Sequence, residues 1–281
     1  MKTNFTFSKY WIESLLLRYQ YSEIENIGGI YFYKKNKLLK CQHFFDFEIK
    51  PKVLDLLLKE VLNDNTIRFN YINNSSLLEQ LKKWSKDNNL IYKVIDSWEA
   101  PRLSIDTSIQ NYLKCNDKKQ IKRNFRKYMD NKAKYKFIFS NKENVLDLWN
   151  DVLLIDYKSW KKSENSDMKS LDREDLQYIL FLLKNSNDSS LVVVYENNNP
   201  LAYSLMFKNL SDNYWYAVKW GASYDGIKVY AGIYCLFSHL EYIYKIDNKL
   251  NIDFWGRRNA TYDLLKNDSI VREHLEISKR K

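Results

Sequence analysis

The spacing of apolar residues is most regular in the last third of the chain, from residue 191 onward. Apolar runs at 191–195, 202–207 and 214–219 are separated by polar turns at 197–200 and 209–212. Since short turns join consecutive runs, we predict a meander of three antiparallel strands. Apolar residues then recur at helical spacing over 230–244, and the remaining pattern predicts a strand at 251–255, a short helix at 259–265 and a strand at 270–277.

The first third of the chain alternates between helical and extended patterns. The extended runs 30–33 and 38–45 flank a turn and predict a hairpin, which Gly28 and Gly29 precede. The remaining pattern predicts helices at 11–19, 53–61 and 77–84 and strands at 66–72 and 90–95. We expect Ile67, Phe69 and Tyr71 to share one face of the strand 66–72, and the strand 90–95 to end before Pro101.

The middle of the chain begins with a basic helix, predicted over 118–134. Its apolar residues Ile121, Phe125, Tyr128 and Met129 share one side, and five basic residues occupy the other faces, namely Lys119, Lys122, Arg123, Arg126 and Lys127. Further on, we predict a strand at 135–139, a helix at 145–160, a polar loop at 161–170 and a helix at 171–184. We expect the inward face of the helix 145–160 to carry Val145, Leu148, Trp149, Val152 and Tyr157.

The composition is that of a folded, basic protein. The chain has 281 residues, of which 45% are hydrophobic and 16% aromatic, so it can bury a sizeable core and is not a disordered polar segment. With only 6 Gly and 3 Pro it is neither collagen-like nor a Pro-rich linker. The formal net charge is +10, because 45 Lys and Arg outnumber 35 Asp and Glu. This charge permits, without requiring, a polyanionic partner such as a nucleic acid or a phosphate-rich cofactor.

The cysteines and the apolar runs bear on the compartment. Cys41, Cys115 and Cys235 are far apart in the sequence, which argues for free thiols in a reducing compartment. The only apolar run near the N-terminus, 15–17, is too short for a secretory signal, and no run approaches the roughly 20 apolar residues of a membrane helix. We therefore expect a cytoplasmic protein without a membrane span.

The order of meander, helix, strand, short helix and strand resembles the GNAT superfamily of acetyltransferases. The segment 259–265 (NATYDLL) resembles the one that follows the fifth GNAT strand. Short matches at 97–103, 111–113, 122–127, 157–161 and 252–256 resemble the large branch that includes cellulose-biosynthesis-type acetyltransferases and is related to Fem-type aminoacyltransferases. The resemblance implies an α/β (α+β) fold, a mixed, mostly antiparallel sheet flanked by helices. It also implies two GNAT-like halves, a degenerate one at 1–97 and a catalytic one at 98–281.

The resemblance places an acyl-CoA donor, acetyl-CoA or another, at the start of the helix 230–244. Residues 228–232 stand where GNAT enzymes carry the pyrophosphate loop; Ala231 and Gly232 would let a pyrophosphate approach the helix N-terminus, and Lys228 could add charge. The ordinary alternative is that Gly232 permits close packing and Lys228 is solvated. The remaining donor-binding residues implied are Val218, Lys219 and Trp220, on the strand that supplies the backbone N–H to the oxyanion, and Asn259.

The resemblance also implies catalytic and acceptor residues. Tyr262 stands at the place of the acid that protonates the leaving thiolate, although an aromatic packing role is as plausible in a chain with 22 Tyr. Asp253 lies in a predicted strand and could orient substrate or act as base, or face outward. Trp160 and Lys161 could line the acceptor pocket, or be core and surface residues. The histidines His43, His239 and His274 are scattered, so neither a Ser-His-Asp triad nor a metal site is supported.

Three functions remain at this point. The first is an acyltransferase that moves an acyl group from a CoA thioester to an amine or hydroxyl of a small molecule, sugar or peptide by direct attack, with no metal. The second is a Fem-like aminoacyltransferase with aminoacyl-tRNA as donor, which the charge favours. The third is a non-enzymatic nucleic-acid-binding protein, for which the basic helix 118–134 is the main feature. The sequence leaves the oligomeric state open.

Overall fold

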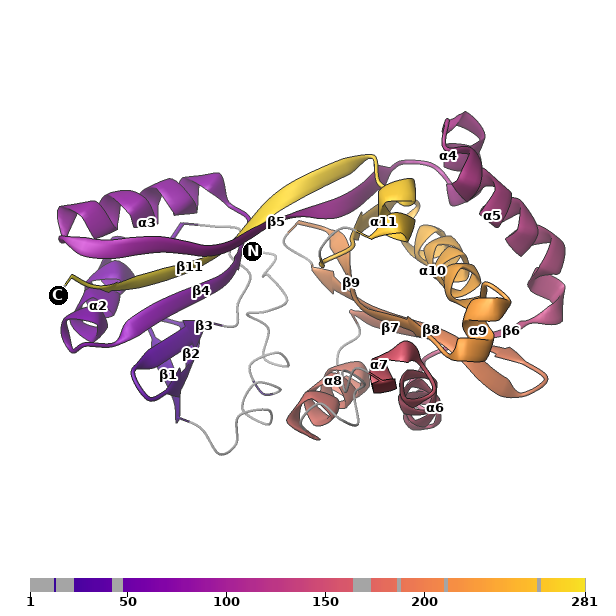
Figure 1. The fold of residues 1–281 in the computed structure, drawn as a ribbon, viewed down its shortest axis with the longest axis horizontal. Coiled ribbons are helices and arrows are strands. Elements are labelled where there is room, and N and C mark those ends of the chain that lie inside the picture. The colour runs from indigo at the N-terminus through magenta and orange to yellow at the C-terminus, as the bar shows by residue number, and fades with distance from the viewer. Residues whose placement is uncertain are drawn as a thin grey trace. The chain divides into compact units, whose positions relative to one another are not determined.

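The computed structural model describes residues 13, 23–41, 48–163, 173–185, 188–209, 212–256 and 259–280. The predicted helix 11–19, apart from Glu13, lies outside these residues, and so does most of the loop predicted at 161–170. The chain forms two compact units (Figure 1): unit 1 comprises residues 1–99 and 270–281, and unit 2 comprises residues 100–269. Each unit has its own helices.

In unit 1, the strand order is β1-β2-β3-β4-β11-β5. The strands are β1 (Glu23–Ile27), β2 (Ile30–Lys35), β3 (Leu38–Cys41), β4 (Thr66–Ile72), β11 (Asp268–Lys279) and β5 (Leu90–Ile105), of which residues 90–99 belong to this unit. The predicted hairpin is confirmed as the antiparallel pair β2–β3. Strand β1 was not predicted; it pairs with β2 through a turn in which Gly28 and Gly29 have positive φ, a conformation that glycine adopts without strain.

The core of unit 1 lies between this sheet and two predicted helices, α2 (Pro51–Leu62) and α3 (Ser75–Asp87). Two expectations about its strands are wrong. Tyr71 has a φ of +58°, which breaks the alternation of β4, so that Ile72 is buried instead and Tyr71 is half-buried. Strand β5 also continues through Pro101 to Ile105, because the proline carbonyl still accepts a hydrogen bond from the Phe254 N–H at 3.0 Å.

In unit 2, the strand order is β5-β10-β9-β8-β7-β6. The strands are β6 (Lys136–Phe139), β7 (Ser189–Glu196), β8 (Asn199–Asn209), β9 (Tyr214–Ala222), β10 (Leu250–Asp253) and residues 100–105 of β5. The predicted meander is confirmed, since β7–β8 and β8–β9 are antiparallel. Strand β10 is antiparallel to β5 and parallel to β9.

Helices cover both faces of the unit 2 sheet. Strand β8 turns Ser204 toward α10 (Ala231–Asp247), where its hydroxyl lies 2.9 Å from His239 Nδ1. The next residue back, Tyr203, faces the opposite way and donates a hydrogen bond to Asp156 of α6 (Val145–Tyr157) at 2.9 Å. Helix α8 (Arg173–Asn185) packs beside α6 against β7. The expectation that Tyr157 is buried is wrong, because α6 ends there and buries Ile155 and Asp156 instead.

The basic helix is confirmed as α5 (Lys119–Asn131), followed by a single 3-10 turn, η2 (Lys132–Lys134). Its residues Ile121, Phe125 and Tyr128 are buried, and the Phe125 ring packs edge-on against Phe237 of α10 at 5.0 Å. The short helices α4 (Ile109–Cys115), α7 (Trp160–Ser163), α9 (Tyr224–Lys228) and α11 (Ala260–Leu265) complete the unit. Of these, only α11 had been predicted as a separate element.

The predicted fold class, a mixed, mostly antiparallel sheet flanked by helices, is therefore confirmed. The assignment of 1–97 and 98–281 as degenerate and catalytic GNAT-like halves stays a prediction. In the described part of the chain, no helix is both long and apolar enough to cross a membrane.

Candidate functional site

The candidate site begins where β9 leaves β10. The two strands pair only at Ile252–Trp215 and Asp253–Tyr216, whereas β9 runs on to Ala222 beside β8. Directly after the paired segment, β9 carries a bulge: Ala217 and Lys219 pair with consecutive residues of β8, and Val218 is the extra residue between them. A bulge bends its strand and increases its twist. Among the described residues, β9 thus has backbone groups without strand pairing from Ala217 onward on the side of β10.

Aromatic side chains pack beside this free edge. The ring of Tyr262, from α11, stacks on Phe254 at 4.4 Å and lies tilted against Trp220 of β9 at 5.7 Å. Asn259 caps α11, because its side chain accepts a hydrogen bond from the Tyr262 N–H at 3.0 Å. Burial raises the pKa of the Tyr262 hydroxyl, and the neighbouring Asn259 side chain offsets part of that rise. The phenol is therefore protonated at neutral pH.

Trp220 connects this aromatic group to the start of α10. Its Nε1–H donates to the Gly232 carbonyl at 2.9 Å, and a Cβ on Gly232 would lie only 3.2 Å from the indole ring. The helix begins after Tyr230, whose φ is +62°, and no side chain caps its first turn. The first helical hydrogen bond runs from the Tyr234 N–H to the Tyr230 carbonyl. The N–H groups of Ala231, Gly232 and Ile233 precede that bond, at the positive end of the helix dipole.

Asp253 is completely buried and belongs to an ion pair. Its Oδ2 accepts from Arg102 Nε at 2.7 Å, and its Oδ1 accepts from the Trp255 N–H at 2.8 Å. The Arg102 guanidinium also lies over the Tyr214 ring, 4.4 Å from its centroid. Burial by itself would lower the pKa of Arg102, but the adjacent Asp253 carboxylate outweighs it and raises that pKa. The side chain of Asp253 thus holds β10 to β5.

The structure brings together some of the predicted site residues. Trp220, Gly232, Asn259 and Tyr262 lie next to one another, with Val218 and Lys219 on the same strand as Trp220. Ala231 is buried at the start of α10. The structure places two others on exposed segments: Lys228 pairs with Asp225 of its own helix at 3.0 Å, and Trp160 lies in α7. The Lys161 side chain lies outside the part of the chain that the structure describes.

Sequence reasoning missed the bulge at Val218 and the role of Arg102. Arg102 and Asp253 stand opposite each other in the β5–β10 register, so a cross-strand pair of opposite charges was the available signal. That signal was hidden because the strand was expected to end before Pro101. A bulge has no comparable signature in a single sequence, since it is defined only by the pairing of two strands.

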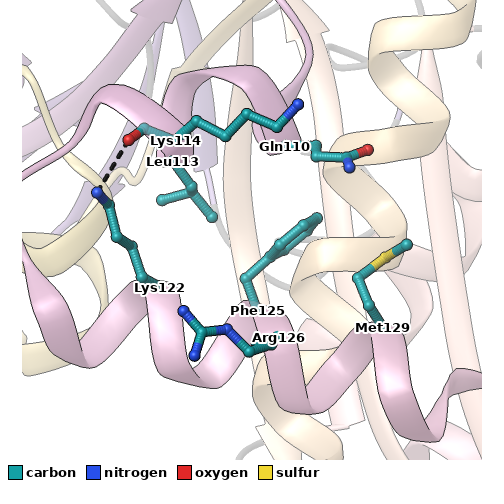
Figure 2. A pocket seen from close by; sticks show the side chains of 7 residues that line it. All are labelled: Gln110, Leu113, Lys114, Lys122, Phe125, Arg126 and Met129. Carbon is teal, nitrogen blue, oxygen red and sulfur yellow. Dashed lines mark hydrogen bonds between the residues drawn. The ribbon is translucent and has the colours of Figure 1, made fainter.

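A separate cavity of about 460 Å³ lies between α4 and α5 (Figure 2). Its apolar lining comes from Leu113, Phe125 and Met129, and its polar lining comes from Gln110, Lys114, Lys122 and Arg126. Lys122 Nζ donates to the Lys114 carbonyl at 2.9 Å, as the dashed line in Figure 2 marks. None of these lining residues is acidic, so the cavity combines an apolar floor with a positively charged rim.

Within the described ranges, no three or more His, Cys, Asp or Glu residues are placed to hold a metal ion.

Comparison of the sequence with known protein families finds no match, and comparison with characterised proteins finds none either. Solved structures do match. FemX has a TM-score of 0.62 and 11% identity, over 95% of this chain and 90% of its own. L-PGS from Bacillus licheniformis has a TM-score of 0.61 and 12% identity, and the match covers 100% of this chain and 94% of L-PGS. A conserved protein of unknown function from Bacteroides thetaiotaomicron VPI-5482 has a TM-score of 0.64 and 12% identity, and the match covers 99% of this chain and 92% of that protein.

At these low identities the likeness concerns the fold. It covers nearly the whole chain, so each unit has a counterpart in each of the three structures.

Proposed function

We propose that this chain is an acyltransferase whose reaction takes place where β9 leaves β10. The observation that carries the proposal is the bulge at Val218, directly beyond the last residue of β9 that pairs with β10. Among the described strands, none pairs with β9 on the side of β10 beyond that point, so a backbone N–H of β9 that faces this side can donate to an acyl carbonyl oxygen. Within the large two-half branch of the GNAT superfamily, residues 98–281 would be the catalytic half.

The proposed reaction is a direct transfer. An amine or hydroxyl of the acceptor attacks the acyl carbonyl carbon, and the carbonyl oxygen becomes an oxyanion next to a β9 N–H. When the tetrahedral intermediate collapses, the bond to the leaving thiolate or alkoxide breaks. Tyr262 gives its proton to that leaving group, and the proton lost by the acceptor restores the phenol. Asp253 acts in this proposal by holding Arg102 and so fixing the end of β10.

The first candidate donor is acetyl-CoA or another acyl-CoA. The start of α10 supports it, because the first-turn N–H groups at Ala231 and Gly232 carry no side-chain cap and favour a pyrophosphate. In this proposal, two further residues contact the donor: Lys228, which lies three residues before α10, and Asn259, which caps α11. The Trp220 ring covers Gly232, so a pyrophosphate there requires that ring to turn away.

The second candidate donor is an aminoacyl-tRNA, and two observations favour it. The cavity of Figure 2 and the exposed basic residues of α5 offer contacts to nucleic-acid phosphates. The raised pKa of Tyr262 also suits the departure of a ribose alkoxide, a stronger base than a thiolate, because proton transfer is most efficient between groups of similar pKa. The fold likeness to FemX and L-PGS is compatible with this donor.

The acceptor in either case would be an amine or hydroxyl of a small molecule, sugar or peptide. Trp160 and Lys161 remain our proposal for its pocket, and a reducing, cytoplasmic location remains our proposal for the protein.

The donor is tested by turnover. The full-length protein is incubated with a panel of acyl-CoA thioesters and, separately, with charged tRNA, each with a mixture of amine and hydroxyl acceptors. Free thiol reports the first reaction, and RNase-sensitive transfer of a labelled amino acid reports the second. Release of CoA or transfer from tRNA supports acyl transfer and identifies the donor. If neither donor is consumed and neither shifts the thermal unfolding temperature, the proposal fails.

A further inference from the structure

Five large apolar side chains are exposed at one region of unit 2. They are Tyr157 at the end of α6, Trp160 in α7, Tyr224 and Ile227 in α9, and Tyr230 just before α10, and each is 45% to 52% exposed. We call these five residues the α7–α9 patch. A soluble monomer normally scatters such side chains singly, and a group of them marks an interaction surface.

Local structure brings the patch together. Tyr157 and Trp160 stand on either side of residues 158 and 159, which connect α6 to α7, and Ile227 and Tyr230 follow Tyr224 within six residues. The Tyr224 N–H donates to the Lys158 carbonyl at 3.0 Å, which joins α9 to the end of α6. Gly226 fixes the opposite side of α9, because a Cβ there would lie 2.3 Å from the Leu201 carbonyl.

Lysines surround the patch. Lys127 Nζ lies over the Tyr230 ring, 4.7 Å from its centroid, and Lys162 Nζ lies over the Tyr157 ring at 5.0 Å. Lys158 and Lys228 are exposed within the same segments. The exposed acidic residue of α9, Asp225, forms its ion pair with Lys228. Among these described residues, four lysines stand beside one acidic residue, so their net charge is positive.

We infer that the α7–α9 patch docks this protein on the surface of an anionic lipid bilayer. Tyr and Trp side chains suit the boundary between headgroups and acyl chains, because each joins an apolar ring to a polar group. Ile227 enters the apolar side of that boundary, and the lysines attract acidic headgroups. Since Tyr230 precedes α10 directly, docking holds the start of α10 at the lipid surface. The inference does not depend on the proposed acyl transfer.

Two other occupants fit the patch less well. A second copy of the chain, related by a two-fold axis, would bring the same lysines face to face, and like charges at an interface oppose association. Single-stranded nucleic acid stacks its bases on exposed ring faces. Here Ile227 has no ring, and a lysine covers one face of both Tyr157 and Tyr230. A bilayer would contact all five apolar side chains and would also attract the neighbouring lysines.

The test is flotation of the full-length protein with vesicles of phosphatidylcholine alone and of phosphatidylcholine with one quarter phosphatidylglycerol. We expect binding to the phosphatidylglycerol vesicles, weakened by salt. Ile227→Ser should lower the partition coefficient about fivefold to tenfold, since it removes apolar surface that enters the lipid. Ile246→Ser is the matched control, because Ile246 of α10 is exposed to the same extent (51% against 50%) outside the patch.

Three outcomes would overturn the inference. The first is no binding to either vesicle by the wild-type protein. The second is equal loss, or no loss, in Ile227→Ser and Ile246→Ser when both variants unfold at the wild-type temperature. The third is that the protein does not bind vesicles, whereas Ile227→Ser selectively weakens another interaction. Weaker binding of polyuridylate would assign the patch to nucleic acid, and weaker self-association in sedimentation would assign it to a second copy of the chain.

Discussion

The Tyr262 hydroxyl lies among the residues that we assign to acyl transfer. Its ring is held between Phe254 and Trp220, and burial keeps its pKa above that of a free tyrosine. A phenol in this state is protonated before the leaving group departs, as a general acid must be. Its packing also explains why sequence reasoning alone could not separate an acid from an ordinary core tyrosine, since Tyr262 is both buried and beside the free edge of β9.

Replacing this hydroxyl tests its role. We expect Tyr262→Phe to lower kcat by about 100-fold or more with little change in KM, because general acid catalysis contributes roughly that factor. Steady-state kinetics with the identified donor gives the result. Tyr195→Phe is the control, because it removes a hydroxyl that donates a hydrogen bond to Asp151 at 2.5 Å, outside the candidate site. Equal activity of Tyr262→Phe and wild type would leave Tyr262 as a packing residue.

The pair Arg102–Asp253 should matter mainly for stability. Asp253→Asn leaves the Arg102 guanidinium buried without its counter-charge, and losing one partner of a buried pair costs about 3 kcal/mol of unfolding free energy. Urea unfolding measures this, with Asp225→Asn as the control, since that exposed pair with Lys228 contributes little. If Asp253→Asn instead abolished turnover while the free energy of unfolding stayed the same, Asp253 would be the base.

His239 gives the protein a pH-dependent stability. The ring is fully buried between Ser190 and Ser204, at 2.9 Å from each hydroxyl, and burial lowers its pKa to about 3. The unfolded chain therefore binds a proton below pH 6.5 that the folded chain does not bind, and stability is lost as the pH falls from there. We expect the free energy of unfolding to drop by about 1.4 kcal/mol per pH unit below about pH 6 from this residue.

Urea unfolding at pH 7.0 and 5.5 measures this slope. His239→Gln should flatten it, because glutamine has no proton to gain. The same slope in the variant would show that other groups produce it.

At the scale of elements, α5 is the segment that distinguishes the two donors. If aminoacyl-tRNA binds there, the double variant Lys122→Glu, Arg126→Glu should weaken tRNA binding at least tenfold and reduce its salt dependence, because each lost phosphate contact lowers the slope. Both residues line the cavity of Figure 2. The control is Lys82→Glu, Lys86→Glu on α3, the same spacing on an exposed helix of unit 1. Equal tRNA binding by the two double variants would exclude α5 as the contact.

The elements that sequence periodicity predicted share strong, local patterns. Helix α5 has apolar residues on one face and charges on the others, and the meander β7–β9 has apolar runs divided by turns. Strand β1 and the short helices α4, α7 and α9 were missed as whole elements, and three further misses involve single backbone positions. The φ of +58° at Tyr71, the end of α6 at Tyr157 and the bulge at Val218 depend on what each strand or helix packs against, which no local pattern encodes.

The candidate site was predictable in part for the same reason. Tyr262, Asn259 and Gly232 were expected from the resemblance to GNAT enzymes, and the structure brings all three together with Trp220 of β9. The contact of Trp220 with Gly232 and the pair Arg102–Asp253 join residues distant in sequence, so they required the fold.

For the whole molecule, part of the net charge of +10 can be assigned to two regions of the structure. Part of it lies on α5 around the cavity, and part surrounds the α7–α9 patch. A phosphate-bearing donor and an anionic bilayer would each use one of these regions, so the two roles can be separated by variants. The fold likeness spans nearly the whole chain in FemX, L-PGS and the Bacteroides protein, so each unit has a counterpart in those structures.

Hydrogen–deuterium exchange with mass spectrometry tests the central claim, that the donor binds along the free edge of β9. The intact protein is measured alone, with acetyl-CoA and with charged tRNA. We predict that the effective donor slows amide exchange in the segment 217–222, together with the first turn of α10. Binding of a donor without any change in the exchange of 217–222 would contradict this account.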